Sequence, residues 1–306
     1  MPEEPHHKIL NRDLTRVEVK ELYGPAIDLL NEVAAYGSNL IPRCLVSSDR
    51  KLADFVIVAV LGKHAVAMVD GVAVLATEGA VTAAHVPARV LFEVYLSVLW
   101  ILRRDPERRA KLYYVWNLRQ ERIWAQRLIS GTPESQAFAS TYSRFNMQAY
   151  PASSKKSQDA AAQVAAIDKL LSEPALSGIN AEFDNLNTRG FDVHWSRPDN
   201  AGSAWKMAVE LSVEAEYKMI YSTFSEVVHG TRYSTHIQFD GDTVLLSPIR
   251  GLRGIDTLLT MTLSYAINLC KVLLKQYRAG EEENFARKYV EEWSERFRSI
   301  PTFRET

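Results

Sequence analysis

Long apolar stretches interrupted by single charges run through the chain, and their spacing is typical of helices packed in a bundle. Apolar residues recur every three or four positions over 17–36, where we expect Pro25 to kink or split the helix. The same pattern predicts a shorter helix opening at Pro133 and longer ones over 81–104, 106–129, 158–172, 203–230, 255–278 and 281–298. The sequence therefore predicts an all-α fold, a large multi-helix bundle.

Residues 50–77 have two interpretations. Asp70-Gly71 lies between alternating apolar residues, which is typical of a tight β-hairpin. The length of the run, its many alanines and the seven-residue spacing of Lys63 and Asp70 instead favour one helix, closed by Gly79. We favour the helix.

Only residues 234–247 predict a β-hairpin without an alternative, because alternating runs flank Asp240-Gly241. Residues 175–203 contain Gly, Pro, Asn and Asp and are typical of a long irregular connection. We expect a flexible N-terminal tail at 1–16 and a single helical domain at 17–306. The polar segment 150–160 is the one candidate for a boundary inside that domain.

Composition narrows the class of protein. The chain has 306 residues, of which 47% are hydrophobic and 24% charged, so it can bury a core. Its net charge of −1 does not indicate nucleic acid or an anionic membrane as the partner of the whole molecule. Charges interrupt the apolar runs before the roughly 18 to 20 residues of a membrane span, and the N-terminus is too polar for a secretory signal. With Cys44 and Cys270 in apolar surroundings, these features predict a cytoplasmic protein with no membrane partner.

Three polar residues share one face of the apolar helix at 81–104. His85, Arg89 and Glu93 are spaced at i, i+4 and i+8. A buried charge must be paired and hydrogen-bonded, so we expect Arg89 and Glu93 to bond to each other and to reach a facing helix. Such a pair either fixes the packing of the helices or belongs to a functional site, and the sequence leaves both open.

A second polar face lies on the helix at 203–230. Tyr221, Ser225 and His229 have the same spacing, and His229 lies at the helix C-terminus, where the helix dipole favours a protonated ring. Two polar faces on two apolar helices predict a cleft. Its candidate catalytic residues are Arg89, Glu93, Ser225 and His229, and its candidate binding residues are His85, Tyr221 and Arg232.

Residues 103–127 combine basic and aromatic residues. They carry eight Lys or Arg against three Asp or Glu, with four Tyr or Trp between them. This composition is typical of segments that bind RNA or single strands, with Arg119 as the candidate binding residue. The alternative is a solvated helix face whose arginine stems cover apolar surface.

Signature motifs of cofactor and metal enzymes are absent from the sequence. It contains no GxGxxG, no Walker loop, no HExxH and no GxSxG. We therefore expect neither a cofactor nor a metal.

Two segments resemble a known family. They are GKHAVAMVDGVAVLATEGAVTAAHVPARVLFE, residues 62–93 with Arg-x-x-x-Glu, and SEVVHG, residues 225–230 with Ser-x-x-x-His-Gly. Together they resemble a large bacterial all-helical family, number fifty-six seventy-seven among the domains of unknown function, over roughly residues 50–275. The resemblance implies an α-helical fold with Arg89, Glu93, Ser225 and His229 as its characteristic polar positions, and it supplies no activity.

A more distant similarity is to the HEPN helical bundles, many of which are metal-independent ribonucleases in toxin and antiviral systems. Their mark is Arg, four to six residues, then His at a helix start. Here Arg232 and His236 have only three residues between them and precede a predicted strand. By analogy, His229 would transfer a proton, Arg89 would stabilise the phosphorane and Glu93 would hold Arg89.

The sequence thus leaves two hypotheses. The one we favour is a non-catalytic interaction or small-ligand-sensing module with a buried Arg/Glu/His cluster. The alternative is a HEPN-like ribonuclease in a bacterial conflict or phage-defence system, so whether the protein is an enzyme stays open. A small polar ligand or RNA would be the partner, and apolar faces near both ends of the chain would suit a homodimer.

Overall fold

The computed structural model describes residues 9–48, 55–144, 154–186, 193–229, 236–241 and 243–303. Contacts divide the chain into two compact units. The core unit comprises Met1–Arg103 and Met207–Thr306, and the inserted unit comprises Arg104–Lys206. The divisions by contacts lie near residues 103 and 206, and the candidate boundary at 150–160 stays a prediction. The expectation of one folding domain stays a prediction, because contacts do not test whether each unit folds alone.

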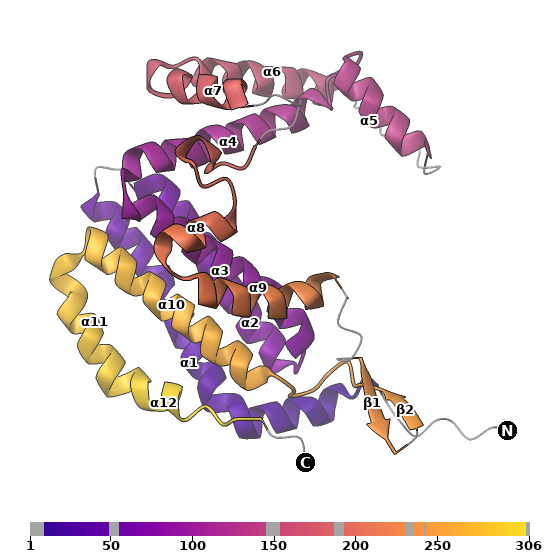
Figure 1. Ribbon diagram of the computed structural model, residues 1–306, viewed down its shortest axis with the longest axis vertical. Coiled ribbons are helices and arrows are strands. Elements are labelled where there is room, and N and C mark those ends of the chain that lie inside the picture. The colour runs from indigo at the N-terminus through magenta and orange to yellow at the C-terminus, as the bar shows by residue number, and fades with distance from the viewer. Residues whose placement is uncertain are drawn as a thin grey trace. The chain divides into compact units, whose positions relative to one another are not determined.

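Four long helices form the centre of the core unit, and the all-α class is confirmed (Figure 1). They are α1 (Arg12–Ser47), α2 (Ile57–Thr77), α3 (Val81–Arg103) and α10 (Ile255–Tyr277). α9 (Glu214–His229) packs on α3. The chain then ends in α11 (Glu282–Lys288), a π-helical turn η5 (Tyr289–Trp293) and α12 (Ser294–Arg298), which contacts α1.

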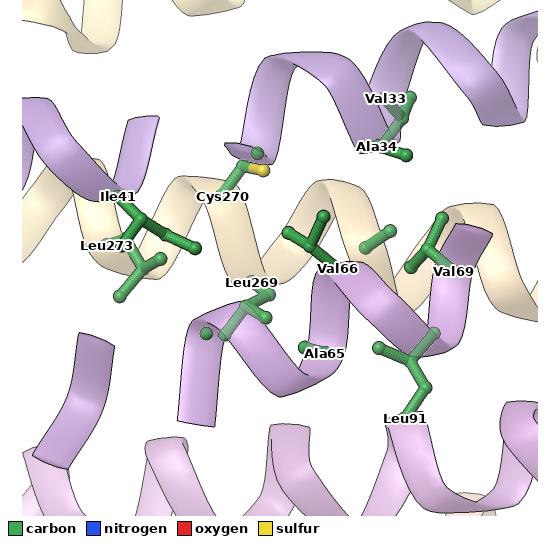
Figure 2. Close-up of a pocket in the computed structure, with 13 residues that line it drawn as sticks. Val33, Ala34, Ile41, Ala65, Val66, Val69, Leu91, Leu269, Cys270 and Leu273 are labelled. Atoms are coloured by element: carbon green, nitrogen blue, oxygen red, sulfur yellow. The ribbon is translucent and has the colours of Figure 1, made fainter. Parts of the chain in front are cut away.

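The central helices pack closely around a small apolar cavity. It lies between α1, α2, α3 and α10 and has a volume of about 20 Å³ (Figure 2). Small residues that line it allow the helices to approach. A Cβ added at Gly37 of α1 would lie 3.0 Å from Val66 Cγ2 of α2, and one at Gly62 would lie 3.4 Å from Ile41 Cδ1. A cavity of this volume has room for about one water molecule but few polar partners for it, so we assign it to packing and not to a ligand.

The helical interpretation of residues 50–77 is confirmed for the described part. α2 is continuous through Asp70-Gly71, and Lys63 and Asp70 both lie on its exposed side. The predicted helix at 81–104 is also confirmed, as α3 with Pro87 inside it.

α1 is longer than the predicted 17–36 at both ends, because it runs from Arg12 to Ser47. It starts at Arg12, where Asn11 Oδ1 accepts a hydrogen bond from the Leu14 amide, so the predicted tail is already helical from residue 12. Pro25 does not split it. Tyr23 and Ile27, on either side of Pro25, are both buried, and this packing supports the helix across the missing N–H.

The predicted helix at 203–230 is two helices, α8 (Ala204–Leu211) and α9. They are separated by Ser212, whose φ of 61° is left-handed and ends α8. Glu210, near the end of α8, accepts a hydrogen bond of 2.6 Å from the indole Nε1 of Trp100 on α3. The prediction of a single helix was wrong. The sequence did not indicate the break, because it has neither Gly nor Pro there.

The predicted hairpin is confirmed as β1 (Ile237–Asp240) and β2 (Thr243–Leu246), which pair antiparallel. Phe239 lies opposite Val244, and Ile237 lies opposite Leu246.

The inserted unit contains α4 (Pro106–Gln126), α5 (Pro133–Arg144), α6 (Ser154–Leu171), α7 (Pro174–Leu186) and a 3-10 turn η2 (Arg197–Asp199). α7 corrects the prediction of an irregular connection over 175–203. Its Leu176, Ile179 and Phe183 are buried at helical spacing with α4 and α6, so packing outweighs the Gly and Asn in its sequence.

Three of the described helices, α2, α3 and α10, are long and apolar enough to cross a membrane by length and composition alone. In their most apolar windows, 44%, 44% and 56% of the residues are buried inside the protein. Burial on that scale fits central helices of a bundle as well, so the expected cytoplasmic location stays a prediction.

Candidate functional site

The Arg89–Glu93 pair lies on the side of α3 that faces α9. Arg89 Nε donates to Glu93 Oε1 at 3.0 Å, as the i, i+4 spacing predicted. The side chain of Arg89 is 16% exposed and that of Glu93 is 40% exposed. The pair is therefore half-buried, and its carboxylate is the more accessible partner.

Two tyrosines of α9 complete the environment of Arg89. The guanidinium carbon of Arg89 lies 4.3 Å from the ring centroid of Tyr221. The ring of Tyr217, one helical turn earlier, stacks on Tyr221 at 4.9 Å with 11° between the planes. A carboxylate and an aromatic face thus fix the guanidinium from two helices.

The side-chain contacts show that α9 runs antiparallel to α3. Phe92 contacts Tyr217 at 6.3 Å, Arg89 contacts Tyr221, and His85 contacts Phe224 at 4.7 Å between ring centroids. Of the predicted site, the structure thus brings Arg89, Glu93 and Tyr221 together, with His85 one turn away on α3.

The other predicted residues of α9 lie further along the same helix. Ser225 and His229 are in its last turns, and their side chains lie outside what the structure describes, as does Arg232 as a whole. The backbone of His229 is eight residues from Tyr221, which is about 12 Å along a helix axis. Arg89 contacts Tyr221, eight residues before that position. The catalytic roles of Ser225 and His229 stay predictions.

Aromatic contacts continue from Tyr217 and Phe92 onto α10. The ring of Tyr265 lies 5.1 Å from that of Phe92 and 5.3 Å from that of Tyr95. We call Tyr221, Tyr217, Phe92, Tyr265 and Tyr95 the aromatic row. Of these residues, only Tyr221 was predicted from the sequence as part of the site. The i−4 position of Tyr217 was a usable signal, whereas nothing local linked Tyr265 to α3.

Burial raises the pKa of Tyr217, Tyr265 and Tyr95. The pKa of Tyr217 rises to about 12, first through burial and then through the negative charges of Tyr221 and Glu93, with Arg89 opposing. Burial also raises the pKa of Tyr265 and Tyr95, and the carboxylate of Glu216 raises both further. These hydroxyls are therefore protonated hydrogen-bond donors at neutral pH.

We expect this row to make the protein sensitive to alkali. The pKa of Tyr217 is higher in the folded state than its ordinary value of 10.0, so the folded state holds the proton more tightly. The resulting stability is complete below about pH 10 and is lost as the pH rises toward about 12. Tyr217→Phe should lose less stability over this interval than the wild type, measured by urea unfolding at stepped pH. Equal losses in both proteins would contradict the assignment.

Arg119, the binding residue expected on the basic helix, belongs to the inserted unit. It is 13% exposed, and its Nη1 donates to Asn180 Oδ1 at 2.7 Å and to Asp184 Oδ1 at 2.8 Å. On the same helix, Arg108 pairs with Glu182 and Arg122 with Asp168. Carboxylates of α6 and α7 thus neutralise much of the positive charge of α4, which weakens the argument for RNA binding there.

Comparison with known proteins gives one finding. The profile of DUF5677, described as a family of unknown function, matches residues 55–243. No curated protein and no solved structure matches the chain. The matched residues include α3 and α9, and therefore the Arg89–Glu93 pair and both of its tyrosines, but not Tyr265.

Proposed function

Since the chain belongs to DUF5677, a family of unknown function, we propose its role from the geometry of α3 and α9: a non-catalytic module that binds a small polar ligand with a cationic, donor-rich group. The observation that carries this proposal is the order of exposure in the ion pair. Glu93 is 40% exposed and Arg89 only 16%, so an arriving ligand meets the carboxylate first. Arg89 is then a positioning residue that holds the carboxylate in place.

The surroundings of Glu93 favour the same class of ligand. Tyrosine faces attract cations, as the stacking of Arg89 on Tyr221 already illustrates. Glu216, in the first turn of α9, is exposed and acts electrostatically on Tyr95 and Tyr265. Lys218 is also exposed on α9.

The ribonuclease alternative requires a different electrostatic design. A phosphodiester needs accessible positive charge to bind and to stabilise its transition state. The guanidinium of Arg89 is instead the less exposed member of the pair and lies between Glu93 and Tyr221. A guanidinium held in this way suits a positioning role better than phosphoryl transfer.

The test is ligand binding by a variant that keeps the shape of Glu93 and removes its charge. We would titrate wild type and Glu93→Gln with spermidine, arginine and choline as cationic probes and with adenosine monophosphate as an anionic probe, by calorimetry. We expect at least one cationic probe to bind, and its affinity to fall about tenfold in Glu93→Gln, which corresponds to roughly 1.4 kcal/mol. Glu292→Gln is the matched control, because Glu292 is the exposed carboxylate of another i, i+4 pair, with Lys288.

Three results would contradict the proposal. Binding of adenosine monophosphate alone would reverse the class of ligand. Loss of thermal stability in Glu93→Gln, with no probe bound by the wild type, would make the pair a structural element that fixes helix packing. Cleavage of total bacterial RNA in the presence of a chelator, abolished in His229→Ala, would establish the ribonuclease.

A further inference from the structure

The buried side chain of Ser196 closes a short loop in the inserted unit. Ser196 is fully buried, and its Oγ accepts a hydrogen bond of 2.9 Å from the Gly202 amide. Its carbonyl oxygen accepts hydrogen bonds of 3.2 Å from the amides of Asp199 and Ala201. The chain therefore folds back on Ser196 from three later positions. We call residues 194–202 the Ser196 loop.

His194 supplies the remaining bonds to Ser196, and these bonds fix its protonation state. Nδ1 of His194 accepts a hydrogen bond of 3.3 Å from the Ser196 amide and lies 2.8 Å from Ser196 Oγ. Because a backbone amide only donates, Nδ1 has no proton, and the ring is neutral with its proton on Nε2. The Ser196 hydroxyl then donates to Nδ1 and accepts from the Gly202 amide, so the directions of all these bonds agree.

The loop also positions the carboxylate of Asp199 at the start of α4. Asp199 Oδ2 accepts from Nε of the fully buried Arg109 at 2.7 Å and from Nη2 of Arg104 at 3.5 Å. Asp199 is three residues after Ser196, and its own amide donates to the Ser196 carbonyl. The contact between Asp199 and Arg109 therefore depends on the closed form of the loop.

An aromatic ring packs on His194, and the charges near the loop bond mainly to one another. The ring of Trp195 lies 5.7 Å from that of His194, and Tyr113 of α4 packs edge-on against Trp195 at 5.2 Å. Burial lowers the pKa of His194 below its ordinary value of 6.5, which favours the neutral ring that the loop requires. The charged groups of the loop, and those that face it from the start of α4 and from α7, are Arg104, Arg108, Arg109, Glu182, Arg197 and Asp199.

We propose that His194 is a pH-sensitive latch of the Ser196 loop: a proton on Nδ1 opens the loop and withdraws Asp199 from Arg109. A protonated ring has an N–H at both nitrogens, so Nδ1 then points a donor at the Ser196 amide and no longer accepts from the hydroxyl. The neutral ring fits the closed loop, and the charged ring fits the open one. Opening separates Arg104 and Arg109 from their shared carboxylate, so acidification frees positive charge at the start of α4.

The pH range of the latch follows from the direction of the pKa shift. The pKa of His194 in the closed loop is lower than the ordinary value of 6.5 expected in the open loop, so the open loop binds the proton more tightly. The closed loop is therefore fully stable above about pH 6.5 and loses stability as the pH falls below it. At about one pH unit below that value, linkage limits the gain of the open form to about tenfold.

Hydrogen exchange measured by mass spectrometry at about pH 7.5 and about pH 5.5 tests the latch. The amides of Ala201 and Gly202 report on the loop, because both donate to Ser196. After correction for the intrinsic pH dependence of exchange, we expect their protection in the wild type to fall severalfold, up to about tenfold, at the lower pH. Peptides of α2 in the core unit should keep their protection, which separates opening of the loop from global unfolding.

Three variants separate the latch from a purely structural role of the ring. His194→Asn keeps an acceptor close to the position of Nδ1 and does not titrate, so the loop should stay closed at both pH values. His194→Ala removes the acceptor, so protection should be low at both. His64→Asn is the matched control, because His64 is exposed on α2 of the core unit, and it should respond like the wild type.

An equal fall in protection in His194→Asn and in the wild type would overturn the proposal, as would unchanged protection in the wild type. Should His194→Asn fail to fold, nitrogen chemical shifts of the His194 ring in the wild type decide the matter. A proton on Nδ1 at neutral pH, or a pKa above 6.5, would contradict the latch. The Ser196 loop lies in the inserted unit and Glu93 in the core unit, so this test and the ligand titration decide separate proposals.

Discussion

Replacing Asp199 with alanine is expected to lower the free energy of unfolding by about 3 kcal/mol, the low end of the cost of breaking a buried ion pair. Asp199 Oδ2 accepts a hydrogen bond of 2.7 Å from Nε of Arg109, whose side chain is fully buried. The alanine variant removes this carboxylate from a guanidinium that stays in the protein interior. Urea unfolding followed by circular dichroism measures the change.

Two further variants show whether burial causes the effect. Asp168→Ala breaks the Arg122–Asp168 pair of the same unit, whose side chains are 39% and 47% exposed, and should cost at most about 1 kcal/mol. Adding Arg109→Met to Asp199→Ala removes the buried charge and should recover part of the stability. If Asp199→Ala were no more destabilising than Asp168→Ala, the structural role assigned to Arg109 would be wrong.

Replacing Gly79 with alanine should destabilise the core unit by about 2 to 4 kcal/mol, from backbone strain together with overpacking. Gly79 has a φ of +64° in the turn between α2 and α3, a left-handed conformation that favours glycine. An added Cβ would also lie 2.2 Å from Cγ2 of Thr15, a buried residue of α1. Thermal and urea unfolding give the change.

Gly254→Ala separates the two causes. Gly254 has a φ of +78°, but nothing lies within 4 Å of an added Cβ, so this variant carries only the strain, about 1 kcal/mol. In the Gly79→Ala background, Thr15→Ser removes the clashing methyl and keeps the hydroxyl that donates to the Asn11 carbonyl, so it should restore part of the loss. Equal effects of Gly79→Ala and Gly254→Ala would show that α1 does not pack tightly on this turn.

Local sequence signals were sufficient to predict structure where the interacting residues lie close together in the chain. The composition of residues 50–77 and the spacing of Lys63 and Asp70 favoured one helix and not a hairpin, and α2 confirms the helix over Ile57–Thr77. The alternating residues around Asp240-Gly241 predicted the hairpin, and the i, i+4 spacing predicted the hydrogen bond between Arg89 and Glu93. In each case the interacting residues lie within a few positions of each other.

Local signals failed where a distant segment supplies the stabilisation. Ser212 ends α8 in a left-handed conformation that serine rarely adopts, while α9 beyond it buries Ile220 and Phe224. α7 is helical because Leu176 and Phe183 pack on other helices, although the sequence around Gly178 suggests a connection.

The candidate site follows the same division. The sequence by itself determined the all-α class, the hairpin, the Arg89–Glu93 pair and the chemistry that such a pair requires, because helix and strand periodicities fix which nearby residues share a face. Only the tertiary structure decided that Tyr221 and Tyr217 cover Arg89, that Tyr265 of α10 extends the aromatic row, and that Glu93 is the accessible partner. The physical reason is that exposure and stacking depend on which helix packs opposite, and packing joins residues far apart in the chain.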